Sequence, residues 1–194
     1  MMGAMPAIDF SGADRLIPLL DAAVRRADPH ATTHAIKDLL CEMFRKRGME
    51  LPAGVCQPCT ESYARRLLYR SPDLGYTVVA MTWGPGQGTV IHDHAGMWCV
   101  EGVWEGQIEV QQFEVMEQQG ERFRFEHCGT LQAGTGSAGC LIPPHEYHLI
   151  RNPLPDLKAV SLHIYGGEME NCHVFEPRDA GWYERKNKPL SYNV

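Results

Sequence analysis

Two histidines one residue apart are the first sign of chemistry in this sequence. His92 and His94 lie in a run with β-branched residues, TVIHDH (89–94). Side chains alternate faces along a strand, so His92 and His94 point the same way while Asp93 points to the opposite face. Two converging imidazoles are typical ligands of a divalent transition metal. Taken alone, the pair is equally consistent with two surface or core histidines.

A third histidine follows on a later predicted strand. His148 lies in EYHLIRN (146–152), more than fifty residues beyond the first pair. In a closed β-barrel the strands face one interior, so His148 could reach the same space as His92 and His94. The residues therefore predict a three-histidine site, provided that the strands close into a barrel.

The residues around these histidines resemble the two cupin motifs. Four residues have the spacing of the first motif: Gly86, His92, His94 and Gly106. Cys99 stands where most cupins carry a glutamate ligand. Three residues match the second motif: Pro143, His148 and Asn152. His145 stands where that motif prefers glycine. The resemblance implies a jelly-roll barrel with a metal inside.

The absence of the glutamate ligand makes the sequence resemble one cupin subfamily, the thiol dioxygenases, and within it the cysteine dioxygenases. The resemblance runs from about Tyr63 to Phe175. It is carried by these segments: Tyr63 and Arg65, WGPGQGTVIHDH with Cys99, His148 with Asn152, and Ser161-Leu-His163-Ile-Tyr165 with Cys172-His173-Val-Phe. It implies Fe(II) held by His92, His94 and His148, with a thiol substrate and O2 in the remaining positions.

The charge at the metal agrees with that implication. Non-haem Fe(II) oxygenases usually combine two histidines with one carboxylate, so a third neutral imidazole leaves the iron one unit more positive. An anionic thiolate restores the balance. Zinc also accepts three histidines, and the residues alone leave zinc open. Glu101 lies two residues beyond the ligand position of Cys99, and we do not expect it to be a fourth ligand.

The resemblance also implies roles for one later strand. Tyr165 matches a tyrosine whose phenol lies beside the iron and hydrogen-bonds substrate or oxygen. In animal members that tyrosine is joined to the cysteine that matches Cys99, so a thioether is a possibility here. We expect His163, on the same strand face, to orient the phenol, and Ser161 to complete the row.

Arg65 matches the arginine by which cysteine dioxygenases bind the substrate carboxylate, a geometry suited to its guanidinium fork. Tyr63 joins it as a predicted substrate-binding residue. L-cysteine, converted to cysteine sulfinic acid, is the expected substrate, with 3-mercaptopropionate or mercaptosuccinate as alternatives; Arg66 could bind the second carboxylate of mercaptosuccinate. The alternative from another class is a non-catalytic cupin that binds a metal or a ligand.

An all-β half is expected to position these residues. Short runs rich in β-branched and aromatic residues, separated by turn residues, predict about eight strands: 76–83, 89–94, 97–104, 107–115, 121–127, 146–152, 158–165 and 172–177. Their spacing indicates a sandwich, jelly roll or barrel. We predict a single cupin domain over 1–194, with a helical part at about 10–70, a barrel at about 75–177 and a polar tail at 178–194 along its outside.

The helical part shows amphipathic spacing. A first helix is predicted from Ser11 to Val24, with a capping box formed by Ser11 and Asp14. A second is predicted from about residue 32 to Gly48, and a third, short one over 60–70, ending before a proline.

Composition excludes several other classes. The chain has 194 residues, of which 44% are hydrophobic and 22% charged, as in an ordinary globular protein. Its 18 Lys and Arg against 24 Asp and Glu give a net charge of -6, so we expect a small-molecule partner and neither nucleic acid nor a membrane surface. The N-terminus lacks the pattern of a secretory signal, so we expect the cytoplasm. Seven cysteines without framework spacing indicate free thiols, metal ligands or catalytic groups and not structural disulfides. Oligomeric state and any role of Cys56 and Cys59 are not predicted.

Overall fold

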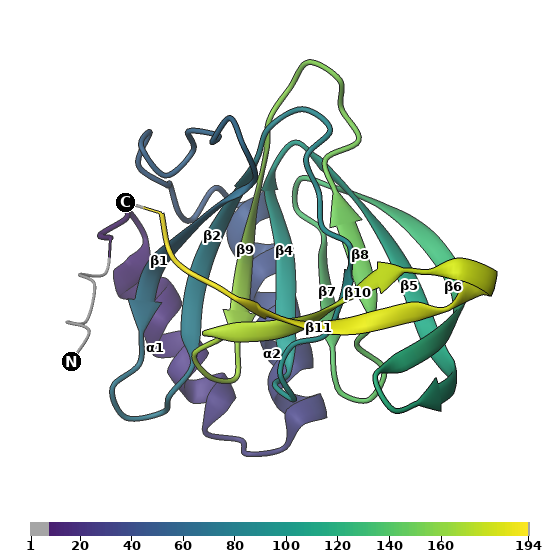
Figure 1. Ribbon diagram of the computed structural model, residues 1–194. Coiled ribbons are helices and arrows are strands. Elements are labelled where there is room, and N and C mark those ends of the chain that lie inside the picture. The colour runs from purple at the N-terminus through teal and green to yellow at the C-terminus, as the bar shows by residue number, and fades with distance from the viewer. Residues whose placement is uncertain (1–7, 194) are drawn as a thin grey trace.

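The computed structural model describes residues 8–193, so residues 1–7, on which the predicted localisation partly depends, and residue 194 lie outside it. Two helices pack side by side on one face of a β-barrel (Figure 1). They are α1, Ala13–Val24, and α2, Pro29–Arg45. Between residues 8 and 193 there is no helix that is both long enough and apolar enough to span a membrane.

One wall of the barrel is a five-stranded antiparallel sheet in the order β1-β2-β9-β4-β7. Its strands are β1 Ala64–Arg70, β2 Thr77–Trp83, β4 Cys99–Glu105, β7 Ala138–Leu141 and β9 Ala159–Tyr165. Every residue of β2 and β9 is buried, because α1 and α2 cover the outer face of the sheet while the other face lines the barrel.

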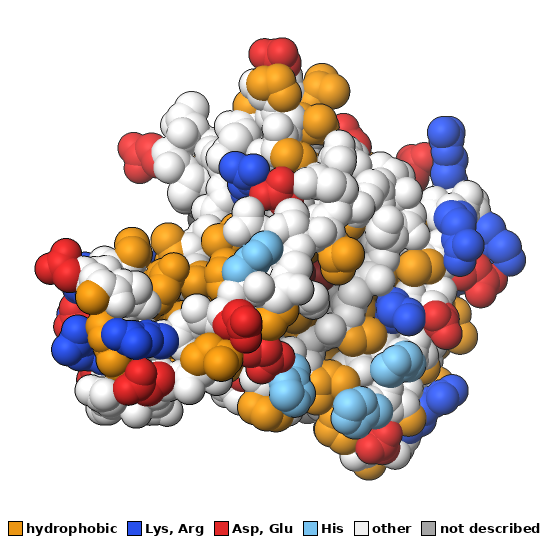
Figure 2. Space-filling view, turned by 90° about the vertical axis from the view of Figure 1, so that its right-hand side faces the viewer, with side chains coloured by type: hydrophobic (Ala, Val, Ile, Leu, Met, Phe, Trp, Pro, Cys, Tyr) orange, Lys and Arg blue, Asp and Glu red, His pale blue; other side chains and the backbone are white. Residues whose placement is uncertain are grey.

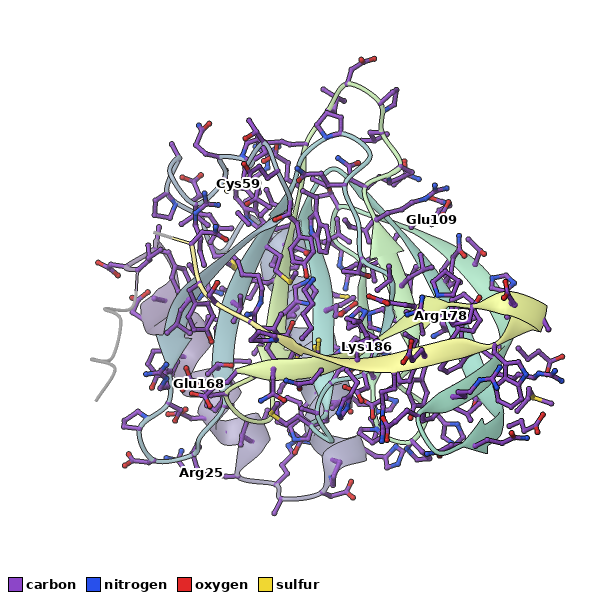
Figure 3. All side chains as sticks on the ribbon, viewed as in Figure 1. Arg25, Cys59, Glu109, Glu168, Arg178 and Lys186 are labelled. Carbon is purple, nitrogen blue, oxygen red and sulfur yellow. The ribbon has the colours of Figure 1, made fainter. Side chains whose placement is uncertain are left out.

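The second wall is a ring of strands in the order β10-β11-β6-β5-β8-β3. Its strands are β3 Ile91–His92, β5 Gln107–Gln119, β6 Arg122–Gly134, β8 His148–Arg151, β10 Asn171–Pro177 and β11 Tyr183–Pro189. Here buried and exposed residues are mixed along the strands because the outer face meets solvent. The fold is thus the all-β barrel with packed N-terminal helices that the sequence predicts, and side chains fill the space between the two walls (Figure 3).

The predicted third helix is wrong, since residues 64–70 form β1. This segment pairs antiparallel with β2, and that pairing overrides its local helical preference. The alternation of a strand sends Arg65 into the barrel and Arg66 outward, where its guanidinium donates to the Val55 carbonyl at 2.9 Å. Arg66 is therefore unable to serve the barrel interior as a second cation.

The predicted capping box is also wrong. The first helix begins at Ala13, its N-cap is Gly12 with φ of 86°, and no side chain caps it. A Cβ on Gly12 would lie 2.3 Å from the carbonyl oxygen of Gly48, so this close approach between the ends of the helical segment requires glycine. Ser11 instead forms a β-bridge with Glu50.

The C-terminal segment differs most from its predicted role as an outer tail. β11 pairs with both β10 and β6 and so completes the ring of strands. The residues after it return to β1, where the Asn193 side chain accepts a hydrogen bond from the Arg65 backbone N–H at 2.8 Å. The sequence missed this strand because its residues, YERKNKP, are mostly polar and form an exposed outer wall.

All seven cysteines are free, as expected. Cys59 lies in the loop before β1 (Figure 3), where its carbonyl accepts a hydrogen bond from the Gln87 side chain. On the face shown in Figure 2, basic, acidic and histidine side chains are interspersed with apolar ones.

Candidate active site

The three predicted histidines converge inside the barrel. His92 on β3 lies directly opposite His148 on β8, and His94 follows two residues later. One nitrogen from each ring lies within 4.8 Å of those of the other two. His94 and His148 are almost completely buried, at 1% and 0% exposure. Asp93 points away, as alternation predicts, and accepts a hydrogen bond from the His173 backbone at 2.9 Å.

Each ring is held through its Nδ1 atom. His92 Nδ1 donates to the carbonyl of Val90 at 3.0 Å, and His148 Nδ1 donates to the carbonyl of Glu146 at 3.1 Å. His94 Nδ1 donates to the carboxylate of Glu146 at 3.1 Å. These acceptors place the proton on Nδ1 and leave the Nε2 lone pairs free to point inward.

The donor set fits a divalent transition metal. Among the described residues, Nε2 of His94 and Nε2 of His148 are buried without a hydrogen-bond partner. Burial lowers the pKa of His92 to about 3 and that of His94 well below its usual value, so the free rings are neutral at neutral pH. Neutral, oriented and unpartnered imidazoles are what a metal ion requires of its ligands.

Glu146 is a functional residue that the sequence analysis missed. Its carboxylate accepts from both the backbone N–H and the ring of His94, at 2.7 and 3.1 Å, while its carbonyl fixes His148. Burial raises its pKa. Its place two residues before His148 was the available signal, because ligand histidines are commonly oriented by a nearby carboxylate.

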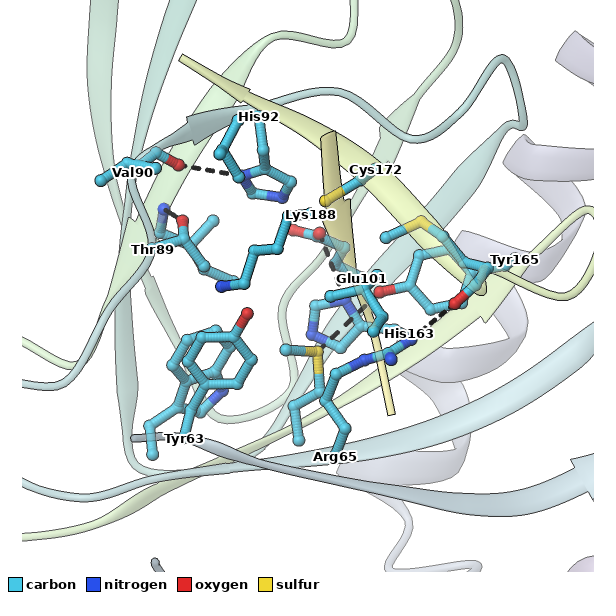
Figure 4. A pocket seen from close by; sticks show the side chains of 16 residues that line it. Tyr63, Arg65, Thr89, Val90, His92, Glu101, His163, Tyr165, Cys172 and Lys188 are labelled. Atoms are coloured by element: carbon cyan, nitrogen blue, oxygen red, sulfur yellow. Dashed lines mark hydrogen bonds and ion pairs between the residues drawn. The ribbon is translucent and has the colours of Figure 1, made fainter. Parts of the chain in front are cut away.

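The five-stranded sheet supplies the opposite wall of the cavity, and Figure 4 shows its side chains facing His92. Strands β1, β4 and β9 contribute Arg65, Glu101, His163 and Tyr165 to the lining. Tyr63, just before β1, lines the same cavity and packs on Trp83 with ring centroids 4.6 Å apart.

Arg65 is a buried cation at this wall, 4% exposed. Its guanidinium donates to the carbonyls of Met169 and Ser191 at 3.4 Å each and lies 5.1 Å from the centre of the Tyr192 ring. Within residues 8–193, none of the ion pairs includes Arg65.

The β9 row has a different connectivity from the one expected. His163 Nε2 contacts the Ser161 hydroxyl at 2.8 Å, and the Tyr165 hydroxyl contacts the sulfur of Met81 at 3.9 Å. His163 and Tyr165 stack with centroids 5.9 Å apart. The orienting role expected of His163 toward the phenol stays a prediction: its ring stacks on Tyr165, while its ring nitrogens face Ser161 and Glu101.

Cys99 and Tyr165 lie directly opposite each other on β4 and β9. Directly opposed residues have neighbouring side chains, so the register brings the thiol and the phenol ring together. Burial raises the pKa of both groups well above their usual values, which keeps them protonated in the free protein.

Two further groups of the cavity were not expected as part of it. Lys188 on β11 reaches its mouth, and Cys172, opposite it on β10, lies in the wall, where burial raises its pKa to about 11. The Lys188 amine is 5.7 Å from the centre of the Tyr63 ring.

Glu101 was noted in the sequence but not expected to be a metal ligand, yet its carboxylate lies 3.4 Å from His148.

Comparison with known proteins assigns the family. The model of the cysteine dioxygenase type I family matches residues 59–178, which is most of the chain and includes all three histidines. The chain belongs to the cysteine dioxygenase type I family. Cysteine dioxygenase type 1 from Rattus norvegicus and from Homo sapiens are each 25% identical over 121 residues, covering 58% of this chain and 54% of the relative.

The chain thus spans about half the length of the curated cysteine dioxygenases it matches. Among solved structures, a protein with a double-stranded β-helix domain from Klebsiella pneumoniae aligns with a TM-score of 0.45 and 16% identity, covering 69% of this chain and 93% of that one. Within the family match lie Arg65, Cys99 and Tyr165, whereas Lys188 and Tyr192 lie beyond it.

Proposed function

We propose that the chain is an Fe(II)-dependent thiol dioxygenase that adds both atoms of O2 to the sulfur of a small carboxylated thiol, with L-cysteine as the first-choice substrate. The observation that carries this proposal is a buried guanidinium, Arg65, that lines the same cavity as His92, one member of a histidine triad fit for a metal. The family match supports the same reaction class.

Arg65 supports the carboxylate part of the proposal. A buried charge is costly unless it is paired, and the carbonyl contacts of Arg65 at 3.4 Å are long. A substrate carboxylate would provide the missing negative charge and accept two parallel hydrogen bonds. It would also fix the direction of the substrate, so that its sulfur extends toward the histidines.

His92, His94 and His148 would hold the iron. When bound, the iron would supply the redox chemistry by which O2 oxidises the thiol sulfur. In the overall reaction the thiol R–SH and O2 give the sulfinic acid R–SO2H, with both oxygen atoms retained on sulfur and the proton on the product.

The remaining groups orient the substrate and exclude water. The raised pKa of Tyr165 keeps its hydroxyl protonated, so it can donate a hydrogen bond to a substrate or an oxygen atom. Met81, Cys172 and Leu190 make part of the lining apolar. A low-polarity wall strengthens each polar contact that the substrate makes inside it.

The test is oxygen uptake by iron-loaded protein with a panel of cysteine, 3-mercaptopropionate, mercaptosuccinate and cysteamine. We expect uptake with the carboxylated thiols, formation of a sulfinic acid, and much weaker use of cysteamine, which lacks the carboxylate. A protein that binds iron but takes up no oxygen with any of the four thiols would instead be a non-catalytic metal-binding cupin.

One observation favours mercaptosuccinate as a second candidate substrate. The Lys188 amine points into the cavity whose wall holds Arg65 (Figure 4), which gives the cavity a second cation. Arg66, the cation expected from the sequence, lies outside the barrel and donates to Val55. A thiol with two carboxylates would satisfy both Arg65 and Lys188.

Lys188→Met tests this candidate because methionine keeps much of the side-chain length without the charge. We expect it to raise KM for mercaptosuccinate about tenfold, the loss of roughly 1.4 kcal/mol, and to leave KM for 3-mercaptopropionate unchanged. Lys186→Met is the matched control, since Lys186 lies on the same strand and pairs with Glu184 outside the cavity. Equal effects on the two thiols would exclude a second carboxylate site at Lys188.

A further inference from the structure

Glu101 occupies an unexpected place in the barrel. It lies on β4 two residues after Cys99, so the alternation of the strand sends both side chains to the same, inner face. Its partner across the sheet is His163 on β9. The Glu101 side chain is only 14% exposed, and none of its ion pairs within the described residues involves lysine or arginine.

The carboxylate of Glu101 is directed at the histidine site. Its Oε1 atom lies 3.4 Å from Nε2 of His148 and 3.9 Å from Nε2 of His94. Both nitrogens are buried and have no hydrogen-bond partner among residues 8–193. Three possible ligand atoms thus face one another at short range.

The separations of Glu101 from two of the three histidines, His148 and His94, are in the range of donors that share one ion. Nitrogen and oxygen ligands lie about 2.1 Å from a transition metal, so two of them are roughly 3.0 Å apart at a right angle and about 3.4 Å apart in a tetrahedron. Opposite ligands are about 4.2 Å apart on the same basis. The distances from Glu101 to His148 and to His94, 3.4 and 3.9 Å, lie within this range.

A row of polar groups, Trp83, Ser161 and His163, lies behind the carboxylate. The indole N–H of Trp83 can only donate, and it donates to the Ser161 hydroxyl at 2.9 Å. The hydroxyl proton is then directed to Nε2 of His163, 2.8 Å away, which places the ring proton of His163 on Nδ1. That Nδ1 atom lies 3.2 Å from Oε1 of Glu101. A histidine that supports a carboxylate in this way is a typical outer partner of a metal ligand.

We propose that Glu101 is the fourth protein donor of the metal site, and that Ser161 and His163 are positioning residues for its carboxylate. The proposal rests on the metal site of the proposed function and not on the reaction. Most cupins carry a glutamate ligand where this chain has Cys99. In this arrangement Glu101, two residues further along β4, supplies that negative charge instead. A metal held in this way would still have room for a sulfur and for O2.

Metal binding by the chelator-stripped protein tests the proposal, with Co(II) as the probe and a competing chelator of known affinity. We expect Glu101→Gln to weaken Co(II) binding by more than about 100-fold, beyond the roughly 10- to 100-fold loss typical of an outer partner. Its visible Co(II) absorption spectrum should also change in shape, because a ligand has been replaced. The control is Glu105→Gln, the same substitution on β4 at a residue that pairs with Lys158. It should bind Co(II) like the wild type.

Two further variants separate a ligand from a structural charge. Glu101→Asp keeps the charge but withdraws the oxygens by one methylene group, so a ligand loses affinity while a mere counter-charge does not. His163→Gln removes a positioning residue, so it should weaken Co(II) binding about tenfold and preserve the shape of the spectrum. Circular dichroism of the metal-free proteins verifies that each variant is folded.

Wild-type affinity and an unchanged spectrum in both Glu101 variants would overturn the proposal and leave a three-histidine site. That result is distinct from failure of the proposed function. If the wild type binds Co(II) through Glu101 but the iron-loaded protein oxidises no thiol, the fourth donor stands and the dioxygenase proposal fails. If Glu101 proves dispensable for metal binding while thiols are oxidised, the dioxygenase proposal stands and the fourth donor fails.

Discussion

The two walls of the barrel bring different chemistry to one cavity. The ring of strands supplies imidazoles, with His92 on β3 and His148 on β8, while the five-stranded sheet supplies Arg65, Glu101 and the phenol of Tyr165. The candidate metal ligands and the candidate substrate-binding groups are thus built on separate supports, which allows one to be altered without the other.

The supports also differ in rigidity. The five-stranded sheet is buried on both faces, with the helices behind it, so its polar groups are fixed by a dense core. By contrast, β3 has two residues and β8 has four, and their outer faces approach solvent. The orientation of the histidines therefore depends on local hydrogen bonds, above all those of Glu146.

The largest expected effect is loss of the metal from the ring of strands. His148→Ala removes a fully buried ligand, so we expect the purified protein to lose both iron and oxygen uptake. Metal analysis checks this, with His127→Ala as the control because His127 is exposed on β6 and contacts Thr130. Full iron content in His148→Ala would remove His148 from the ligand set.

On the opposite wall the effect should fall on the substrate. Arg65→Ala should keep its iron and raise KM for carboxylated thiols by roughly ten- to a thousand-fold, because the substrate carboxylate loses a buried partner. Cysteamine has no carboxylate, so its kinetics are the internal control. If KM changes equally for every thiol, Arg65 supports the fold and not the substrate.

The same contrast explains what the sequence predicted. The histidine triad was predicted because its members lie on strands with alternating faces and within spaced motifs. The contacts that Asn193 and Tyr192 make with Arg65 were not predicted. Both residues come from a polar segment whose position depends on partners far away in the sequence. Residues 60–70 show the same limit, since pairing with β2 decided between helix and strand.

Glu101 shows a different limit. The one-dimensional spacing of the cupin motif placed the ligand position at Cys99, and it did not reveal that a longer side chain two residues on reaches the same point. The direction of β4 across the barrel determines which of its inward residues meets His148, and β4 is held in place by its packing with β7 on α2.

Rigidity of the five-stranded sheet can be tested through its contact with α2. A Cβ on Gly102 of β4 would lie 2.6 Å from a ring carbon of Phe44 and 3.1 Å from a methyl carbon of Leu40. Gly102→Val should therefore lower the free energy of unfolding by about 1–3 kcal/mol through overpacking. Gly139→Val on the neighbouring β7 is the control, because a Cβ there meets no atom within 4 Å. Thermal unfolding of both variants makes the comparison, and equal stabilities would show that α2 adapts freely.

The ring of strands should respond to acid at the pair that joins β5 to β8. Glu109 accepts a hydrogen bond from Arg151 at 2.8 Å, and this contact lowers the pKa of Glu109 from 4.5 to about 2. A lowered pKa in the folded state adds stability above pH 4.5 that is lost as the pH falls toward 2. We expect the pair to add about 1 kcal/mol to the free energy of unfolding, because Arg151 is half exposed and solvent screens its charge.

Glu109→Gln should accordingly flatten the stability curve of the protein over that pH range, and denaturant unfolding at several pH values measures it. Glu126→Gln is the control, since Glu126 is an exposed carboxylate on β6 that has no ion pair within residues 8–193. If the slope is unchanged in Glu109→Gln, the pair does not anchor β8.

The smallest expected effect concerns the thioether that we propose between Cys99 and Tyr165. The register of β4 and β9 places the two side chains next to each other, and iron with O2 would supply the oxidant during turnover. Joining sulfur to the ring removes one hydrogen from each residue. Intact-mass analysis should therefore find a lighter population that grows with turnover and is absent in Cys99→Ser. Since Cys99 is not among the proposed ligands, Cys99→Ser should keep its iron and measurable activity. Complete loss of activity in an iron-replete Cys99→Ser protein would show that the thiol itself is essential on this wall.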